Sequence, residues 1–364
     1  AGRRGFPCRA AATRVTSDPM PPHPRLERVP AARARAARAV AEAVATARSV
    51  VLTTHVNADG DGVGSEVAMV HLLRALGTQV AIANPTPIPE RYAFLREAVR
   101  GHDRTGDAVK AVRGADLFLV LDIADLGRLG HLGAPLAERG VTAACIDHHV
   151  SPGTLPAGPR LVDATAAATG ELVYDLAATV GWPLSAEAAR ALYVAILTDT
   201  GGFRFSNTGP RTLRVAASLL EHGVEPERVY ESVYATAPVG RLRLTAEVLE
   251  TLVVEPDVGL SWLTVPAGAV ERHGTTPDDL EGLVEMARSV QGTRLALLFR
   301  PLASGAIKVS FRSVGTVDVA TFARGFGGGG HAKASGASIA GTLDEVQRTV
   351  LNAARRMLGD GAPR

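Results

Sequence analysis

The chain has 364 residues, and its 39 Lys and Arg against 37 Asp and Glu give a formal net charge of +2. This length allows two domains of ordinary size, and the near-neutral charge excludes a general polyanion binder. No apolar run approaches the roughly 20 residues that cross a bilayer, so we expect no membrane partner. Cys8 and Cys145 lie far apart and suggest no disulfide framework, which favours a cytoplasmic protein.

The first thirty residues differ from the rest. They are rich in Arg and Pro and contain no apolar segment of the signal-peptide kind. We therefore expect residues 1–30 to form a disordered tail.

From residue 31 onward, helical patterns alternate with short apolar runs. After a helix up to residue 49, strands are expected at residues 50–55, 79–83, 116–122 and 142–147. A helix is expected over residues 65–77, with Ser65 as its N-cap and Gly77 at its C-terminal end. Strands that alternate with helices predict a parallel sheet covered on both faces.

A second α/β pattern follows a mostly helical region. Its strands are expected at residues 251–256, 260–265, 294–300 and 306–312, with helices at 278–290 and 343–358. We predict a catalytic domain over residues 31–225, a connection over 226–240 and a smaller domain over 241–364. The expected fold class is α/β, with an N-terminal parallel-sheet domain, a smaller C-terminal α/β domain and an active-site cleft between them.

Carboxylates and imidazoles gather where the predicted strands end. They are His55, Asp59 and Asp61 after the first strand, Asp122 after the third, Asp147, His148 and His149 after the fourth, and Asp199 at the end of the helical run 185–199. Ligands of open parallel sheets bind beyond the carboxyl ends of the strands. We therefore expect these side chains to meet at one edge of the sheet.

Such a set of ligands indicates metal ions, because close carboxylates are costly without a cation between them. Oxygen ligands mixed with imidazole favour Mn²⁺ or Mg²⁺, with Zn²⁺, Co²⁺ and Fe²⁺ also possible. The set is too large for one ion, so we expect two, as in hydrolytic sites for phosphate esters. Two other acidic residues, Asp163 and Asp175, are expected to be surface or capping residues.

A glycine run lies in the second domain. Residues 325–336 read GFGGGGHAKASG, and four consecutive glycines are unfavourable inside a helix or strand. They instead allow backbone N–H groups to converge on an anion. His331 and Lys333 within the run, and Arg312 nearby, indicate phosphate capture.

These motifs resemble those of the DHH phosphoesterase superfamily, in the branch whose second domain is of the DHHA1 type. The matching segments are HVNADGD, LDIAD, IDHH, LTDTGGF and GGGGHAKASG, in the expected order. Chain length and motif spacing are similar to those of its bifunctional nano-RNase and pAp phosphatase members. Ala58 departs from the pattern, because many relatives have proline at that position.

The resemblance implies a role for each matched residue. His55, Asp59 and Asp122 would hold one metal, whereas Asp61, Asp122, His148 and Asp199 would hold the other, with Asp122 bridging. Asp147 would orient a histidine without binding a metal itself. His149 would contact the substrate phosphate or assist proton transfer. Arg312, Gly329, Gly330 and His331 would bind the terminal phosphate or nucleotide.

The implied activity is the hydrolysis of very short oligoribonucleotides and of linear dinucleotides such as pApA, together with conversion of pAp to AMP. The implied cofactors are two divalent ions, with Mn²⁺ first. Long duplex nucleic acid is not an expected partner, and a homodimer is compatible with the resemblance. Three alternatives remain: a cyclic di-AMP phosphodiesterase, a family II-like inorganic pyrophosphatase and a non-catalytic nucleotide sensor.

Overall fold

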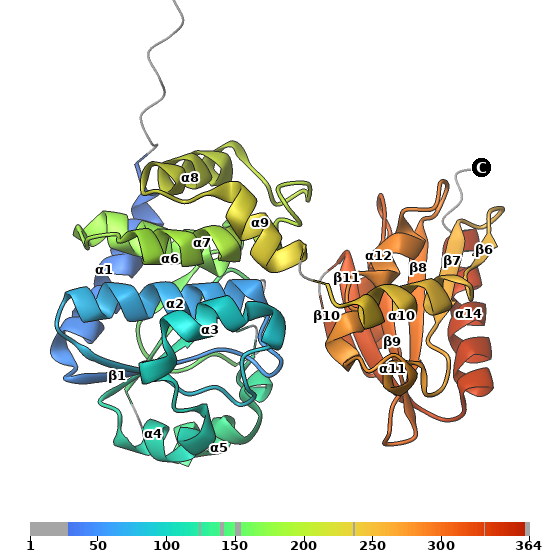
Figure 1. Cartoon of the computed structure of the whole chain (residues 1–364), viewed down its shortest axis with the longest axis horizontal. Coiled ribbons are helices and arrows are strands. Elements are labelled where there is room, and N and C mark those ends of the chain that lie inside the picture. The colour runs from blue at the N-terminus through green and yellow to red at the C-terminus, as the bar shows by residue number, and fades with distance from the viewer. Residues whose placement is uncertain are drawn as a thin grey trace, which may run out of the picture. The chain divides into compact units, whose positions relative to one another are not determined.

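The computed structural model describes residues 28–123, 125–138, 142–149, 154–235, 237–330 and 332–360. The predicted tail falls almost wholly outside these residues, and so does His331. The chain forms two compact units that divide between Val233 and Tyr234 (Figure 1). This division lies within the predicted connection, residues 226–240.

The first unit is built on a five-stranded sheet with the strand order β2-β1-β3-β4-β5. All its strands are parallel, which confirms the predicted parallel sheet. Its strands are β1 (Ser49–Thr53), β2 (Gln79–Ile82), β3 (Leu117–Leu121), β4 (Ala143–Asp147) and β5 (Arg160–Val162). Strand β5 was not predicted, because it is a three-residue edge strand in which only one side chain is buried.

Helices cover both faces of this sheet. They are α1 (Ala31–Thr46), α2 (Gly60–Ala75), α3 (Ala93–Ala98), α4 (Ala108–Gly114), α5 (Gly133–Glu138), α6 (Thr169–Val180), α7 (Ala186–Asp199), α8 (Pro210–Glu221) and α9 (Pro226–Tyr234). Side chains alternate along a strand, so Leu119 packs in the core under α2, α6 and α7, whereas Phe118 and Val120 pack under α4 and α5. Figure 1 shows α2 and α7 on one side and α4 and α5 on the other.

Helix α2 begins five residues before the predicted N-cap, so the assignment of Ser65 to that role is wrong. The N-cap is Asp59, whose carboxylate accepts hydrogen bonds from the backbone N–H groups of Asp61 (3.1 Å) and Gly62 (3.2 Å). Because this carboxylate satisfies the first free N–H groups, the glycine-containing motif can enter a helix directly.

The glycines of α2 allow it to pack closely on α7. A Cβ atom on Gly60 would lie 2.4 Å from Oγ1 of Thr198, and one on Gly64 would lie 2.5 Å from the carbonyl oxygen of Ala191. These glycines therefore do not serve to turn the chain around the aspartates, as a loop would. They bring the first turn of α2 next to the end of α7.

The second unit contains a six-stranded mixed sheet with the order β10-β11-β9-β8-β7-β6. Its strands are β6 (Val253–Glu255), β7 (Leu260–Thr264), β8 (Leu295–Pro301), β9 (Ala306–Ser313), β10 (Gly329–Gly330) and β11 (Ala334–Ala340). Only β7 and β8 pair in parallel. This sheet confirms the predicted α/β character of the C-terminal region.

Two groups of helices cover the second sheet. They are α10 (Val239–Leu249), α11 (Ala269–Arg272) and α12 (Leu283–Arg288), and then α13 (Val319–Arg324) and α14 (Leu343–Asp360). The first group packs on Leu263 and Leu298, and the second packs on Phe299, Val309 and Phe311. All the helices in the described part of the chain are too short or too polar to cross a membrane.

The glycine run contributes a strand, contrary to expectation. Gly329 and Gly330 of β10 pair with Gly336 and Ser335 of β11. A Cβ atom on Gly328 would lie 2.2 Å from the carbonyl oxygen of Gly336, and Gly330 has a φ of +137°. Glycine is therefore needed here because the two backbones approach too closely for a side chain.

Candidate metal centre

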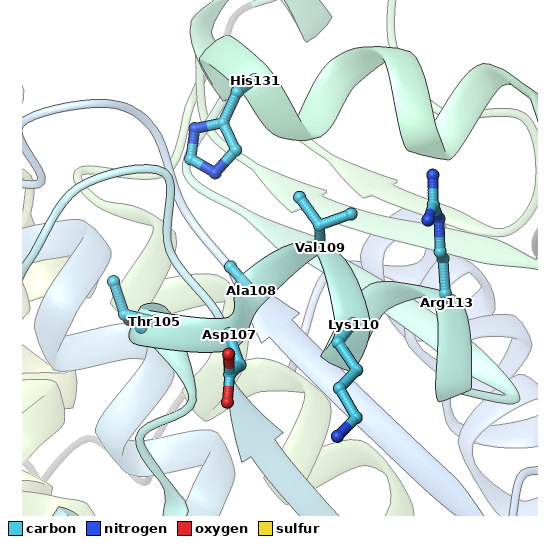
Figure 2. Close-up of a pocket in the computed structure, with 8 residues that line it drawn as sticks. Thr105, Asp107, Ala108, Val109, Lys110, Arg113 and His131 are labelled. Carbon is cyan, nitrogen blue, oxygen red and sulfur yellow. The ribbon is translucent and has the colours of Figure 1, made fainter.

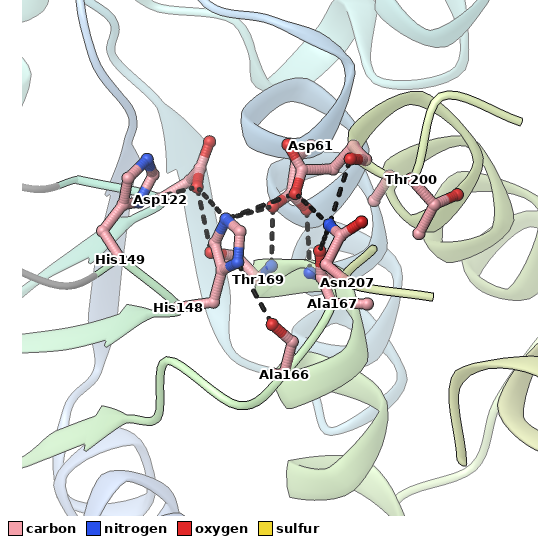
Figure 3. A network of polar contacts seen from close by, with 12 residues as sticks. Asp61, Asp122, His148, His149, Ala166, Ala167, Thr169, Thr200 and Asn207 are labelled. Atoms are coloured by element: carbon pink, nitrogen blue, oxygen red, sulfur yellow. Dashed lines mark hydrogen bonds and ion pairs between the residues drawn. The ribbon is translucent and has the colours of Figure 1, made fainter. Parts of the chain in front are cut away.

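The carboxyl edge of the first sheet collects the side chains that the sequence singles out. Figure 3 shows four of them, Asp61, Asp122, His148 and His149. His55 and Asp59 come from the β1–α2 connection, and Asp61 comes from the first turn of α2. Asp122 follows β3, His148 and His149 follow β4, and Asp199 is the last residue of α7. The four segments meet because parallel strands end at a common edge.

One group consists of His55, Asp59 and Asp122. The Nε2 atom of His55 lies 3.6 Å from Oδ2 of Asp122 and 3.7 Å from Oδ2 of Asp59. Ligand atoms that share an ion at about 2.1 Å lie roughly 3 to 3.5 Å apart. These separations are slightly wide for hydrogen bonds and suit three ligands around one cation.

A second group consists of Asp61, His148 and Asp199, with Asp122 at its edge. The Nε2 atom of His148 lies 3.5 Å from Oδ2 of Asp199, 3.6 Å from Oδ2 of Asp61 and 3.8 Å from Oδ1 of Asp122. Asp122 therefore presents Oδ2 to the first group and Oδ1 to the second, which is the geometry that a bridging carboxylate requires.

Both histidines present the nitrogen that a metal would need. Nδ1 of His55 lies 2.8 Å from the carbonyl oxygen of Val56, and Nδ1 of His148 lies 3.3 Å from that of Ala166. A proton on Nδ1 that is donated to a carbonyl leaves a lone pair on Nε2. Nε2 of His55 is buried and has no hydrogen-bond partner among the described residues, and a bound cation would supply one.

The charges of the cluster also indicate a cation. Burial and the nearby carboxylates of Asp122 and Asp199 raise the pKa of Asp61 well above its ordinary value. Burial is the main cause that raises the pKa of Asp199 to about 7, and Asp59 and Asp122 add to it. Without added positive charge, the protein therefore cannot hold all of these carboxylates ionised at neutral pH. A divalent cation would relieve this repulsion, so the residues present fit a metal centre.

His149 has a different environment from the other two histidines. Its Nδ1 lies 2.7 Å from Oδ1 of Asp147, which also accepts the backbone N–H of His149 at 3.2 Å. Burial lowers the pKa of His149, but the carboxylates of Asp147 and Asp122 outweigh burial and raise it. Asp147 is fully buried and thus fixes the orientation of the imidazole.

Three residues at the centre were missed in the sequence: Thr169, Gly170 and Asn207. The backbone N–H groups of Thr169 and Gly170 donate to the carboxylate of Asp61 at 2.6 and 2.9 Å, and Oγ1 of Thr169 donates to Oδ1 of Asp122 at 3.0 Å. Nδ2 of Asn207 donates to Oδ2 of Asp199 at 3.4 Å. None of the three carries a charge, so the search for acids and imidazoles passed over them.

Asp122 has an unusual backbone conformation, with a φ of +56°. This left-handed conformation is uncommon for residues other than glycine, although Asp and Asn adopt it more readily than most. The backbone N–H of Asp122 donates to the carbonyl oxygen of Ile146 at 3.0 Å, which continues the β3–β4 pairing up to this turn. The turn directs the Asp122 side chain to the sheet edge.

In the second unit, Arg312 already has protein partners. Its Nε donates to Oε1 of Glu285 at 2.7 Å, and a terminal nitrogen donates to the carbonyl oxygen of Phe311 at 3.0 Å. Lys333 donates to the backbone carbonyl oxygens of Gly315 and Val317. Its ammonium group is thus used to close a loop, whereas Arg312 lies on strand β9.

A separate hollow in the first unit does not contribute to this centre. It has a volume of about 420 Å³ and is lined by residues 105–110, Arg113 and His131 (Figure 2). None of the side chains of the two ligand groups lines it, so the candidate centre is the cluster at the sheet edge.

Comparison with known proteins gives two domain matches. The DHH family N-terminal domain matches residues 49–196, and the DHHA1 domain matches residues 262–360. The bifunctional oligoribonuclease and PAP phosphatase NrnA of Thermus thermophilus is 35% identical over 326 residues, covering 88% of this chain and 94% of that protein. The protein of the same name from Bacillus subtilis is 30% identical, covering 82% and 92%.

Solved structures agree in fold. An exopolyphosphatase-related protein from Bacteroides fragilis has a TM-score of 0.83 and 26% identity, covering 89% of this chain and 98% of that one. RecJ from Thermus thermophilus, solved with Mn²⁺, has a TM-score of 0.56 and 18% identity, covering 93% of this chain and 56% of that one. The chain is therefore a hydrolytic enzyme of the DHH phosphoesterase family, in which a DHH domain is followed by a DHHA1 domain.

Proposed function

We propose that this enzyme is a two-metal phosphoesterase that hydrolyses very short oligoribonucleotides and linear dinucleotides such as pApA to mononucleotides. We further propose that it removes the 3′-phosphate of pAp to give AMP. The two relatives named above, which cover most of the chain, support this substrate class. The observation that carries the proposal is the convergence of two ligand groups on the two oxygens of Asp122.

The proposed ligands of the first ion are His55, Asp59 and Asp122, and those of the second are Asp61, Asp122, His148 and Asp199. Mn²⁺ is the proposed ion, because oxygen ligands outnumber imidazoles and the ligand groups found among the described residues contain no cysteine. When bound, two such ions supply Lewis acidity to a phosphoryl oxygen and make water a stronger nucleophile at neutral pH.

His149 is the proposed contact to the reacting phosphate. Its Nδ1 is engaged by Asp147, so Nε2 is the nitrogen through which it would donate to a phosphoryl oxygen or to the departing oxygen. Asp147 fixes the ring and favours the charged imidazolium, which complements the developing negative charge.

The second unit is the proposed source of further phosphate contacts. Arg312 and Lys308 lie four residues apart on β9, so their side chains share one face of the sheet, and Lys308 is directly opposite Arg300 of β8. Burial and the charge of Arg300 lower the pKa of Lys308, although Asp278 opposes this change. A bound anion would stabilise these positive charges. The backbone N–H groups of Gly329 and Gly330 are further proposed contacts to the phosphate.

Short substrates are favoured over long ones. The net charge of +2 provides no extended basic track, so long duplex nucleic acid is not a proposed substrate. His331 stays a sequence-based prediction as a phosphate contact. A homodimer, also a prediction, can be tested by light scattering.

The decisive experiment is product analysis by anion-exchange chromatography with Mn²⁺. The substrates are pApA, pAp, a 5-mer RNA, cyclic di-AMP and pyrophosphate, each with and without a chelator. AMP from pApA and pAp, abolished by the chelator, is the expected result. Cleavage of cyclic di-AMP would extend the substrate range, whereas phosphate from pyrophosphate alone would overturn the proposal for the second unit.

A further inference from the structure

One short stretch of backbone contacts most of the second ligand group. This stretch, residues 166–170, joins β5 to α6 and includes the first two residues of the helix. Its contacts are Ala166 O to His148 Nδ1 (3.3 Å), Thr169 N and Gly170 N to Asp61 (2.6 and 2.9 Å), Thr169 Oγ1 to Asp122 (3.0 Å) and Ala167 O to Nδ2 of Asn207 (2.9 Å), which reaches Asp199. Figure 3 shows Ala166, Ala167 and Thr169 of the stretch beside Asp61, Asp122, His148 and Asn207. A small displacement of the stretch would therefore move four ligands together.

Both ends of this stretch are tied to a single side chain of α1. Arg33, which is 4% exposed, donates from Nε to Asp163 at 2.6 Å and from Nη2 to Thr165 at 3.0 Å, just before the stretch. From Nη1 it donates to Glu171 at 2.9 Å and to Asp175 at 3.0 Å, just after the stretch. The guanidinium group thus spans the stretch from one end to the other.

The part of this network on α6, Glu171 and Asp175, is buried, which corrects the expectation for one acidic residue. Asp175 is not a surface or capping residue, since its exposed fraction is 0% and it pairs with Arg33 and Arg211. The other oxygen of Glu171 accepts from Ala167 N at 3.3 Å, inside the stretch itself. The position of the stretch therefore depends directly on a carboxylate that Arg33 holds.

We infer that Arg33 is a positioning residue for the proposed metal centre, because it fixes the backbone stretch that orients Asp61, Asp122, His148 and Asp199. The inference rests on the proposed function only in assuming that these residues bind metal. Arg33 precedes the part of the chain that matches the DHH domain, residues 49–196. Removing a residue that holds metal ligands in place commonly lowers metal affinity by about 10- to 100-fold.

The test is Mn²⁺ binding by titration calorimetry on the full chain, below the melting temperature of each variant. Arg33→Met should weaken binding at one of the two sites by about 10-fold or more. The matched control is Arg38→Met on the same helix, because Arg38 is exposed and, among the described residues, its guanidinium reaches only the carbonyl oxygen of Ala34 at 3.5 Å. The control should bind Mn²⁺ like the wild type.

A second readout separates positioning from loss of folded protein. For Arg33→Met, the Mn²⁺ concentration that gives half-maximal hydrolysis of bis-p-nitrophenyl phosphate should rise, while the rate at saturating Mn²⁺ largely recovers. If Arg33→Met does not fold, Asp163→Ala removes the Arg33–Asp163 bond and the bonds from Thr165 to Asp163, while the bonds of Arg33 to Thr165, Glu171 and Asp175 remain. It should show a smaller loss of affinity in the same direction.

Folded variants at both positions that bind Mn²⁺ as tightly as the wild type would overturn the inference and leave the proposed function intact. A wild-type protein that binds no divalent ion would instead overturn the proposed function, and the inference with it. Because the calorimetry uses no nucleotide, a wrong substrate assignment cannot affect the result.

Discussion

The fully buried carboxylate of Asp147 accepts a 2.7 Å hydrogen bond from Nδ1 of His149. This pair predicts that Asp147 affects turnover rather than metal content. Asp147→Asn should lower kcat for pApA by about 10- to 100-fold while leaving Mn²⁺ affinity nearly unchanged, because neither side chain belongs to the proposed ligand sets. Steady-state kinetics and calorimetry on the same sample measure both. An equal loss of metal affinity would show instead that Asp147 supports the ligands.

Asp122 is predicted to be indispensable, because its two oxygens face the two ligand groups. Asp122→Ala should reduce hydrolysis of pApA and pAp by at least about 100-fold and should lower the number of Mn²⁺ ions bound. The control is Asp116→Asn near the other end of β3, where the carboxylate accepts from Arg48 and Ser49, its only donors in the described part of the chain. We expect Asp122→Ala to bind nucleotide without turning it over. Full activity of this variant would rule out the assignment of Asp122 as the bridging ligand.

Two neighbouring glycines should respond differently to alanine. Gly328→Ala would place a Cβ atom 2.2 Å from the carbonyl oxygen of Gly336, so we expect the second unit to lose about 1–3 kcal/mol of its free energy of unfolding. Gly329→Ala has no atom within 4 Å of the new Cβ and should be stable. Urea unfolding followed by Trp262 fluorescence in a Trp182→Phe background reports the second unit.

The same pair tests phosphate contact by the glycine run. If substrate phosphate approaches the backbone of β10, Gly329→Ala should raise KM for pAp without changing stability. An unchanged KM would mean that the run serves the β10–β11 pairing alone.

Glu66 predicts a pH-dependent stability. It is fully buried on α2, where Oε2 accepts from Nδ2 of Asn84 at 2.9 Å and Oε1 has no partner. Burial is the main cause that raises the pKa of Glu66 to about 8, and the charge of Asp103 adds to it. The folded protein therefore keeps a proton that the unfolded chain releases above its ordinary pKa of about 4.3.

The free energy of unfolding should consequently fall as pH rises from about 5 to 8, by up to about 1.4 kcal/mol per pH unit from this group. Glu66→Gln removes this pH-dependent contribution. The free energy of unfolding of the variant, relative to that of the wild type, should therefore increase with pH across this window. Urea unfolding in chelator measures the difference, with exposed Glu42→Gln on α1 as the control. A difference that does not vary with pH would show that Glu66 is ionised in the folded state.

The strands that the sequence predicted most clearly are those whose apolar side chains are buried on both faces of the sheet. All five side chains of β3 and of β4 are buried, which explains why their apolar runs were clear. Strand β11 was missed because its Ala, Ser and Gly side chains carry little hydrophobic signal. The start of α2 was misplaced because Asp59, expected only as a ligand, also caps the helix.

At the candidate centre, the sequence identified the side chains with distinctive chemistry and missed those that act through backbone or hydroxyl groups. His55 and Asp122 stand out by residue type and position at a strand end. Thr169 and Gly170 act mainly through N–H groups that every non-proline residue has, so no residue pattern marks them. Arg33 lies 130 residues from Asp163, and only the folded chain shows that they meet.

All the proposed metal ligands lie between residues 55 and 199, within the first unit alone. The hydrolytic chemistry can therefore be inherited as a module, separate from the unit proposed to contact the substrate's phosphates. Changes in Arg312, Lys308 or the β10–β11 hairpin can alter which phosphate ester is accepted, while the catalytic apparatus stays as it is. Such a division allows substrate range to diverge in evolution without any intermediate that has lost its metal centre.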